Sequence, residues 1–185
     1  MNKEEMNKIL RLSGILFVIC AIVAGVLGIV NEITKDRIYA IQNAATIAAY
    51  SAVLESDSYD AVDYDHSAFP TVDKLSRADN GSGYVAELTV SGAQGLITLA
   101  VGVDNDYACT GISIIAHSET SGLGANAAAD SEIGRSFRAQ FVGEGEDIAL
   151  SKSGGHIEAL SGATITSDAV TGAVATAIQA VKALG

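Results

Sequence analysis

The sequence predicts an α+β protein with one N-terminal membrane helix and one mixed domain outside the membrane. Three observations carry this prediction: a long apolar run near the N-terminus, short runs rich in β-branched residues between turn residues, and a helical apolar pattern at the end of the chain. A length of 185 residues leaves room for one globular domain and one appendage.

The apolar run Leu12–Val30 predicts a transmembrane helix within an anchor segment, residues 1–37. Ser13 is its only clearly polar side chain, and at about 1.5 Å per residue the run spans roughly the hydrocarbon core of a bilayer. Three basic residues precede the run and two follow it, which favours a cytoplasmic N-terminus. A cleaved signal peptide and a buried helix of a soluble protein are the alternatives. The run is long for a signal peptide, and no Ala-x-Ala site follows it.

Residues 38–185 are predicted to form the domain outside the membrane. They contain 6 basic and 18 acidic residues, a balance of −12, whereas the whole chain carries −11. Because nucleic-acid binding needs a basic surface, this class of partner is excluded. An apolar content of 49% with 18% charged residues excludes a disordered chain. Cys20 and Cys109 are too few for a disulfide framework or a four-cysteine zinc site.

The secondary-structure pattern of the domain predicts an antiparallel meander with flanking helices. We expect a helix over residues 31–55, a loop over 56–70, strands over 83–90, 96–103 and 110–116, a helix over 131–141, a loop over 143–147, a short strand or extended segment over 157–160, and a helix over 168–184. The final helix has an apolar face formed by Val170, Val174, Ala177, Ile178, Val181 and Leu184.

The sequence predicts no metal site and no catalytic triad. Asp63 and Asp65 faintly resemble a calcium loop, but the required Gly and the terminal Glu are missing, so a solvated acidic loop is the better interpretation. The three histidines are scattered and do not have the spacing of metal ligands.

The segment Ser161-Gly-Ala-Thr-Ile-Thr-Ser167 lies directly before the final helix and is rich in small and hydroxylated residues. A helix N-terminus offers free N–H groups and a dipole that favours an anion such as phosphate. The glycine and alanine would let a bulky group approach the backbone closely. The alternative is plain capping of the helix by Thr166 or Ser167. Capping does not explain the hydroxyl groups of Ser161 and Thr164.

A second unusual segment, His117-Ser-Glu-Thr-Ser-Gly-Leu-Gly124, directly follows a predicted strand. Its end, Gly122-Leu-Gly-Ala-Asn-Ala127, matches a loose GxGxxA dinucleotide-binding pattern. Four polar residues separate the strand from the first glycine, and the surrounding pattern is a meander rather than a βαβ unit, so we discount this match. His117 by itself is typical of a hydrogen-bonded structural residue.

These two segments resemble the two signatures of the FMN-binding domain family. Residues 160–167 resemble its covalent flavinylation motif, and residues 117–124 resemble its second motif, usually His-x-Glu-Thr-Pro-Gly-Leu-Gly. The motif spacing, the single anchor and the order of elements are similar to those of the G subunits of Rnf electron-transport complexes. The C subunits of the sodium-pumping NADH:quinone reductase are close relatives but are typically longer.

The resemblance implies an FMN joined through its phosphate to the hydroxyl of Thr164 as a phosphodiester, installed by a separate flavin transferase. The other residues that it places at the cofactor are Ser161, Gly162, Ala163, Glu119, Thr120, Gly122 and Leu123. It implies that Leu123 packs against the isoalloxazine ring, and that Glu119 and His117 order the loop.

Two positions depart from the family pattern. Glu158 stands where the transferase-recognition pattern begins with Asp, so the carboxylate is kept but lengthened. Ser121 stands where the second motif usually has Pro, which should loosen that loop slightly.

The resemblance implies a single-pass electron carrier within an Rnf-type ion-translocating ferredoxin:NAD oxidoreductase in the plasma membrane. The FMN domain is expected outside the cytoplasm, with the other membrane, iron–sulfur and flavin subunits as partners. A flavin suits this role because it can exchange one or two electrons. The alternatives are a quinone-reductase C-type subunit or another extracytoplasmic FMN carrier, and a cofactor-free anchored scaffold.

Overall fold

The computed structural model describes the backbone of residues 3–185 and all their side chains except those of residues 3–10, 12 and 36–42. The chain divides into two compact units, Met1–Ala44 and Ala45–Gly185. The expected boundary between anchor and domain at residues 37 and 38 stays a prediction.

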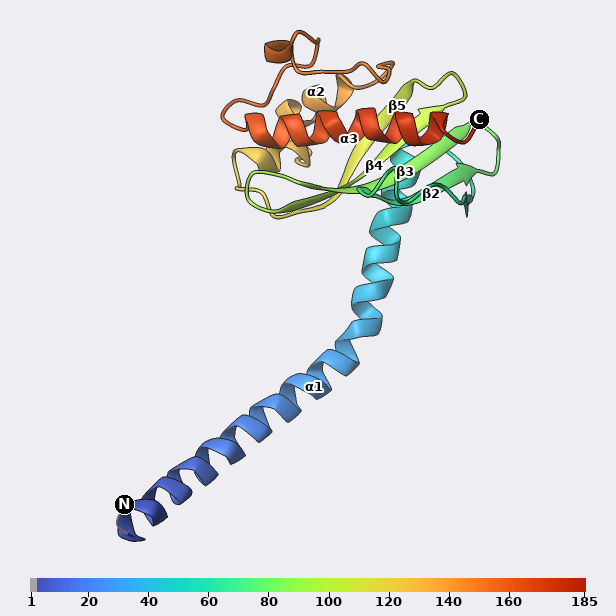
Figure 1. The fold of residues 1–185 in the computed structure, drawn as a ribbon. Coiled ribbons are helices and arrows are strands. Elements are labelled where there is room, and N and C mark those ends of the chain that lie inside the picture. The colour runs from blue at the N-terminus through green and yellow to red at the C-terminus, as the bar shows by residue number, and fades with distance from the viewer. Residues whose placement is uncertain (1–2) are drawn as a thin grey trace. The chain divides into compact units, whose positions relative to one another are not determined.

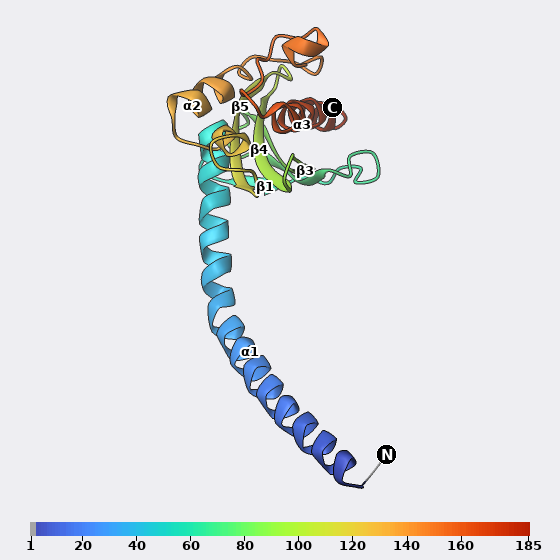
Figure 2. The ribbon, with the colours of Figure 1, turned by 90° about the vertical axis from the view of Figure 1, so that its left-hand side faces the viewer.

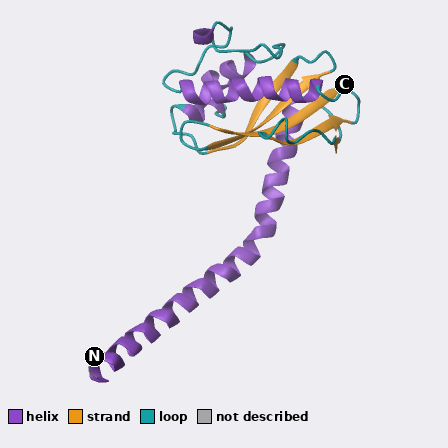
Figure 3. Cartoon of the chain, in the orientation of Figure 1, coloured by secondary structure: helices purple, strands orange, loops and turns teal. Residues whose placement is uncertain are grey.

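The elements alternate little between helix and strand: one long helix comes first, then five strands, then the shorter helices (Figures 1 and 3). In order they are α1 (Lys3–Val53), β1 (Tyr59–Ala61), β2 (Val72–Ala78), β3 (Gly83–Ser91), β4 (Leu96–Asp104), β5 (Cys109–His117), the 3₁₀ helix η1 (Gly124–Ala127), α2 (Glu132–Ala139), the 3₁₀ helix η2 (Ser151–Ser153) and α3 (Thr164–Lys182). This arrangement confirms the α+β class.

Helix α1 contains the expected membrane segment. Among the described residues, Ser13–Lys35 is the one stretch that is long and apolar enough to cross a membrane, with a mean hydropathy of 2.7. The predicted run Leu12–Val30 lies almost wholly inside it. None of this stretch is buried against other parts of the chain. Full exposure of apolar side chains argues against the alternative of a buried helix in a soluble protein.

The five strands form one antiparallel sheet in the order β1-β2-β3-β4-β5, so each strand pairs with its neighbour in sequence. The predicted meander is confirmed, but two of its strands were not predicted. The expected loop over residues 56–70 contains the three-residue strand β1, and β2 follows it. Strand β2 escapes the period-2 pattern because a register shift between Val72 and Lys74 breaks the alternation of buried and exposed residues.

Both faces of the sheet are covered by helix. Helix α3 lies across one face (Figures 1 and 2), and its buried residues join the main core with the inward side chains of β2 to β5. The last turn of α1, with Tyr50 and Val53, packs on the opposite face against a smaller cluster. Neighbouring residues of β3 show the division, because Val85 belongs to the smaller cluster and Ala86 to the main core.

Helix α3 begins at Thr164, four residues before the expected start at Asp168. The expectation was wrong because the β-branched and hydroxylated residues at this end are weak helix formers, so propensity placed them in a loop. The predicted apolar face is confirmed. Five of its six residues are fully buried, and Leu184 is partly buried against the core.

The remaining elements agree with the predictions more closely. Helix α2 lies within the expected range 131–141, with Ser131 as its N-cap, and residues 143–147 form turns and loop. In the segment 157–160, only Ile157 makes an isolated bridge, to Leu150, so the segment is an extended entry to α3 rather than a strand. The two 3₁₀ helices were not predicted.

Candidate functional site

The two motif segments meet at one small cavity of about 120 Å³. The lining residues come from the β3–β4 turn, the loop after β5 and the start of α3: Ala93, Gln94, Glu119, Thr120, Leu123, Gly124, Gly162, Ala163 and Thr166. Five of them were expected at the cofactor: Glu119, Thr120, Leu123, Gly162 and Ala163. The other expected residues, Ser161, Gly122 and Thr164, do not line the cavity but are exposed beside lining residues in the chain.

The β3–β4 turn was missed as part of the site. Ala93 and Gln94 line the cavity, although nothing in their residue types indicates ligand binding. One feature of the sequence could have indicated that this turn belongs to the site: the predicted hairpin places it at the edge of the sheet where β5 ends. Backbone pairing of Ile97 with His117 brings the turn to the second motif.

The N-terminus of α3 is open. Its N-cap is Ala163, and no side chain of the described residues caps this end. Helix α2 of the same domain is capped normally, because the Ser131 hydroxyl accepts a hydrogen bond from the Gly134 N–H at 3.2 Å. Thr164 is the first residue of α3, and its side chain is exposed at the open end. The first N–H groups of a 19-residue helix are therefore available to an anion at Thr164.

The hydroxyl groups expected to cap α3 have other partners, so the capping expectation was wrong. Both residues lie inside the first turns of α3. The Thr166 hydroxyl donates to the carboxylate of Glu119. The Ser167 hydroxyl accepts from the Leu160 N–H at 3.0 Å and donates to the Ala163 carbonyl at 2.9 Å. Ser167 thus fixes the segment that leads into the helix.

Gly162 and Leu123 bring the two motifs into contact. Gly162 has a φ of +70°, which L side chains rarely adopt, and a Cβ atom there would lie 3.1 Å from Cδ2 of Leu123. Leu123 lines the cavity and is 44% exposed. An exposed apolar side chain at the mouth of a cavity can cover one face of a planar aromatic ligand.

Glu119 is the only buried residue of the loop 117–123, with 9% of its surface exposed. Oε1 accepts from the Gln94 N–H at 3.0 Å, and Oε2 accepts from the Thr166 hydroxyl. Burial tends to raise the pKa of Glu119, but hydrogen bonds from Gln94, Thr166 and the adjoining turn amides outweigh it and hold the pKa below its ordinary value. The side chain is therefore a carboxylate at neutral pH.

Hydrogen bonds within residues 117–125 hold the loop of the second motif. His117 Nδ1 accepts from the Glu119 N–H at 3.3 Å, which agrees with a structural role for this histidine. The Thr120 carbonyl accepts from the N–H groups of Leu123 and Ala125, both at 3.2 Å. The GxGxxA match ends in the 3₁₀ helix η1, after a strand of an antiparallel sheet, so it lacks the βαβ setting of a dinucleotide site.

Glu158 lies six residues before Thr164 and is exposed. Its backbone is fixed from both sides by Gln140: the N–H donates to Oε1 at 2.7 Å, and the carbonyl accepts from Nε2 at 3.2 Å. The backbone that carries the exposed Glu158 side chain is therefore fixed.

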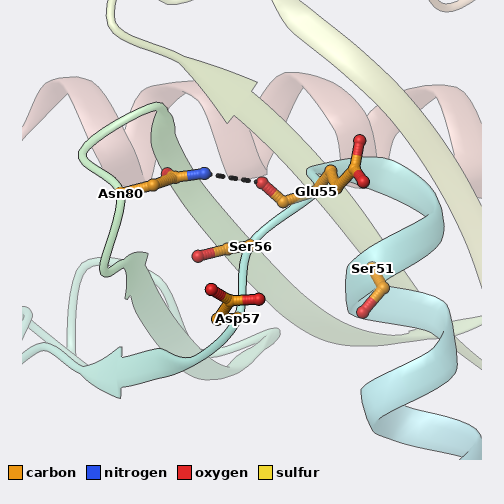
Figure 4. A pocket seen from close by; sticks show the side chains of 5 residues that line it. All are labelled: Ser51, Glu55, Ser56, Asp57 and Asn80. Carbon is orange, nitrogen blue, oxygen red and sulfur yellow. Dashed lines mark hydrogen bonds between the residues drawn. The ribbon is translucent and has the colours of Figure 1, made fainter.

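A second hollow, of about 470 Å³, lies between the end of α1 and the β2–β3 turn (Figure 4). It is lined by Ser51, Glu55, Ser56, Asp57 and Asn80, and the Asn80 side chain donates to the Glu55 carbonyl at 2.8 Å. A phosphate-bearing ligand would meet two carboxylates there and no basic lining residue. The hollow is larger than the cavity at which the two motifs meet, but its acidic lining does not suit a flavin nucleotide.

The expected acidic loop forms a turn around Asp65. Its Oδ1 accepts from the N–H and the hydroxyl of Ser67, at 2.9 and 2.7 Å, and from the Ala68 N–H at 3.3 Å. Asp65 therefore holds this turn by accepting hydrogen bonds from the two residues that close it. Among the described residues, no group of three His, Cys, Asp or Glu side chains is arranged to hold a metal ion.

Families of known proteins match both the N-terminal helix and the domain that follows it. The FMN-binding domain family matches residues 92–179, and the RnfG N-terminal region family matches residues 1–53. The G subunit of an ion-translocating oxidoreductase complex from Methanosarcina acetivorans is 31% identical, over 97% of this chain and 98% of the relative. The G subunit of the Na(+)-translocating ferredoxin:NAD(+) oxidoreductase complex from Acetobacterium woodii is 30% identical, over 95% and 92%.

Among solved structures, the C subunit of the Na(+)-translocating NADH-quinone reductase from Parabacteroides distasonis is similar. It shares 26% sequence identity over 57% of each chain, with a TM-score of 0.43.

Proposed function

Because the chain belongs to the family of G subunits of ion-translocating oxidoreductase complexes, we propose that it is the membrane-anchored FMN electron carrier of an Rnf-type complex. The FMN is attached through its phosphate to the hydroxyl of Thr164. The single observation that carries this assignment is the open N-terminus of α3, which begins at the very threonine that the motif resemblance selects.

The geometry around Thr164 supports a phosphodiester at this position. The hydroxyl is exposed, so a transferase can reach it. The phosphate would lie at the uncapped N–H groups of α3, where the helix dipole stabilises negative charge. Gly162 leaves the approach to this end free of a side chain, and Leu123 beside it supplies apolar surface for the ring. The residues present therefore fit FMN.

The size of the cavity explains why a covalent bond is useful. Sites that hold a free small molecule measure about 300–1,000 Å³ and bury most of its surface. The cavity here has about 120 Å³ and cannot enclose an FMN. A bound FMN is therefore partly exposed, which leaves it accessible to redox partners. The covalent link prevents dissociation from a site that buries too little surface to retain the cofactor.

A flavin transferase is the partner that maturation requires. Glu158 offers its carboxylate at the surface, at the position where the recognition pattern has Asp. Since Gln140 fixes the backbone of Glu158 on both sides, the longer side chain projects from a defined point. We infer that the transferase accepts Glu here.

Other subunits of the complex deliver and remove the electrons. FMN supplies one- and two-electron redox chemistry, and the residues of this chain position the cofactor and adjust its potential. The anchor α1 keeps the domain at the membrane, with the N-terminus in the cytoplasm and the FMN domain on the opposite side. We retain the apolar segment in the mature protein because the N-terminal family match runs through it to residue 53.

Replacement of the attachment hydroxyl tests the proposal. In a host that also expresses a flavin transferase, Thr164→Val should abolish flavin fluorescence of the denatured protein band. Thr176→Val is the matched control, because Thr176 lies further along α3 and its hydroxyl bonds only to the Gly172 carbonyl. This control should keep wild-type fluorescence. Flavin that survives denaturation in Thr164→Val would refute the attachment site.

A further inference from the structure

The carboxylate of Glu119 occupies a closely fitted socket at the wall of the cavity. A Cβ atom on Gly92 would collide with Oε1, and a Cβ atom on Gly124 would collide with Oε2. Both glycines are therefore needed for the carboxylate to enter. The N–H of Gln94 donates to Oε1 from the same turn, so the socket presents backbone donors to a negative charge.

This one side chain connects the three segments that form the site. It belongs to the loop after β5, it accepts from Gln94 in the β3–β4 turn, and it accepts from Thr166 in the first turn of α3. Thr166 is fully buried, and it lies two residues after the attachment residue Thr164. The carboxylate therefore fixes the loop that carries Leu123 relative to the end of the helix that carries the phosphate.

The charge of Glu119 is isolated in a neutral neighbourhood. The other cavity-lining residues are uncharged, and the lining includes no basic side chain. A negative charge with 9% exposure is screened less by water and salt than the exposed carboxylates of the domain. Its field therefore acts more strongly on a group bound in the cavity than the field of a surface carboxylate would.

We propose that Glu119 is a positioning residue whose fixed negative charge lowers the reduction potential of the flavin at this site. The inference rests on the proposed function, since it requires an FMN on Thr164. An electron added to the flavin places negative charge beside the carboxylate, so the charge disfavours the reduced form relative to the oxidised form. Hydrogen bonding by Thr166 and the turn amides moderates this field without removing it.

Two substitutions separate the charge from the contacts. Glu119→Gln keeps the shape of the side chain and removes the charge, so the midpoint potential of the covalently bound FMN should shift to a more positive value. Thr166→Val keeps the charge and removes one donor that moderates it, so the potential should shift in the opposite direction. The measurement is spectroelectrochemical titration of the flavin-loaded full chain in detergent.

The matched control is Asp168→Asn, which also removes one carboxylate near the start of α3 but from an exposed position. Solvent screening should make its shift smaller than that of Glu119→Gln. Equal shifts for Glu119→Gln and Asp168→Asn, or no shift for Glu119→Gln, would overturn the inference. If Glu119→Gln does not fold, Thr166→Val decides: a shift to a more negative potential supports the inference, and an unchanged or more positive one overturns it.

The outcome for the wild-type chain distinguishes this inference from the proposed function. A wild-type protein without covalent flavin would refute the proposed function itself. A flavin-loaded wild type with the same flavin potential as Glu119→Gln would refute only the role of Glu119. Thermal unfolding of the flavin-free variants supplies a second readout, since loss of the charge in its socket should lower the melting temperature of Glu119→Gln even without cofactor.

Discussion

At the scale of single residues, the start of α3 is left uncapped because the nearby hydroxyl groups bind other partners. Thr164 begins a long helix that has no side-chain cap, and Thr166 and Ser167, which could have capped it, are bonded elsewhere. A helix end left open beside a cavity stabilises a ligand at the expense of its own capping energy, about 0.5–2 kcal/mol. This exchange is expected at a functional site.

The low pKa of Glu119 makes the stability of the domain dependent on pH. A carboxyl group whose pKa is lower in the folded state stabilises the fold above its unfolded pKa, and this contribution is lost as the pH falls through the folded pKa. At neutral pH, Glu119→Gln should therefore lower the free energy of unfolding by about 1–3 kcal/mol, because it removes charged hydrogen bonds. The difference from wild type should shrink in acid, below the ordinary pKa of 4.5.

Urea unfolding of flavin-free wild type and Glu119→Gln across the acidic range measures this prediction. Glu132→Gln, an exposed carboxyl in the first turn of α2, is the control, and solvent screening should make its effect at neutral pH smaller than that of Glu119→Gln. A stability difference for Glu119→Gln that stays constant, or grows toward low pH, would contradict the assigned direction of the shift.

At the scale of elements, the end of α1 and the two residues after it are fixed to the rest of the domain through their carbonyl groups. Helix C-termini usually gain from basic side chains, and α1 has none in its last turn. Three side chains of the domain donate instead: Thr110 to the Val53 carbonyl, Tyr59 to the Leu54 carbonyl, and Asn80 to the Glu55 carbonyl. Figure 4 shows the last of these bonds.

A notch formed by Gly102 and Gly111 admits this turn of helix. These glycines are paired across β4 and β5, and a Cβ atom on Gly102 would lie 2.6 Å from the Val53 carbonyl oxygen. Gly102→Ala should therefore lower the free energy of unfolding of the domain by about 1–3 kcal/mol through overpacking. Thermal or urea unfolding of the full chain in detergent measures the change.

Gly172→Ala is the matched control for the notch. Gly172 lies inside α3, and a Cβ atom there would meet no atom within 4 Å, so alanine should stabilise the helix by about 0.5–1 kcal/mol. Opposite signs for these two Gly-to-Ala changes are the expected result. A neutral Gly102→Ala would show that the turn of α1 does not need the notch.

Comparison of sequence and structure shows which elements local pattern can predict. Strands β3, β4 and β5 have β-branched residues and turn residues at their ends, and their positions were predicted to within a residue or two. Strand β2 was missed because it carries Lys74 and Arg77 and a register shift, so only its pairing partners define it as a strand. The start of α3 was missed because tertiary contacts, rather than propensity, hold its first turn.

The site was also predictable only where local sequence motifs identify its residues. Motif resemblance selected the residues on the two loops, and five of them line the cavity. Ala93 and Gln94 could not be selected, since they contribute backbone and position rather than distinctive chemistry. The partnership of Glu119 with Thr166 joins residues 47 positions apart, which no local pattern reports.

At the scale of the whole molecule, the chain combines an apolar helix with a domain whose charge balance is −12. The proposed orientation places residues 45–185 outside the cytoplasm. Lys152 is exposed in η2, so Lys152→Cys should react with a membrane-impermeant maleimide on intact cells stripped of any outer barrier. Labelling only after lysis would show that the domain lies on the cytoplasmic side and would contradict the proposed orientation.

The native cysteines provide the background for that experiment. Cys109 is buried, and burial raises its pKa to about 12, so it carries almost no reactive thiolate. Cys20 lies within Ser13–Lys35, the stretch proposed to span the membrane, where a membrane-impermeant reagent should not reach it. The wild-type chain should therefore stay unlabelled before and after lysis.

Covalent FMN on Thr164 is the feature on which the proposed function depends. Intact-mass spectrometry of the denatured protein, purified from its native membrane and followed by fragment mapping, tests it most directly. The expected result is a mass increase equal to one FMN phosphodiester, located on the peptide that contains Thr164. An unmodified mass, or an adduct on another residue, would contradict it.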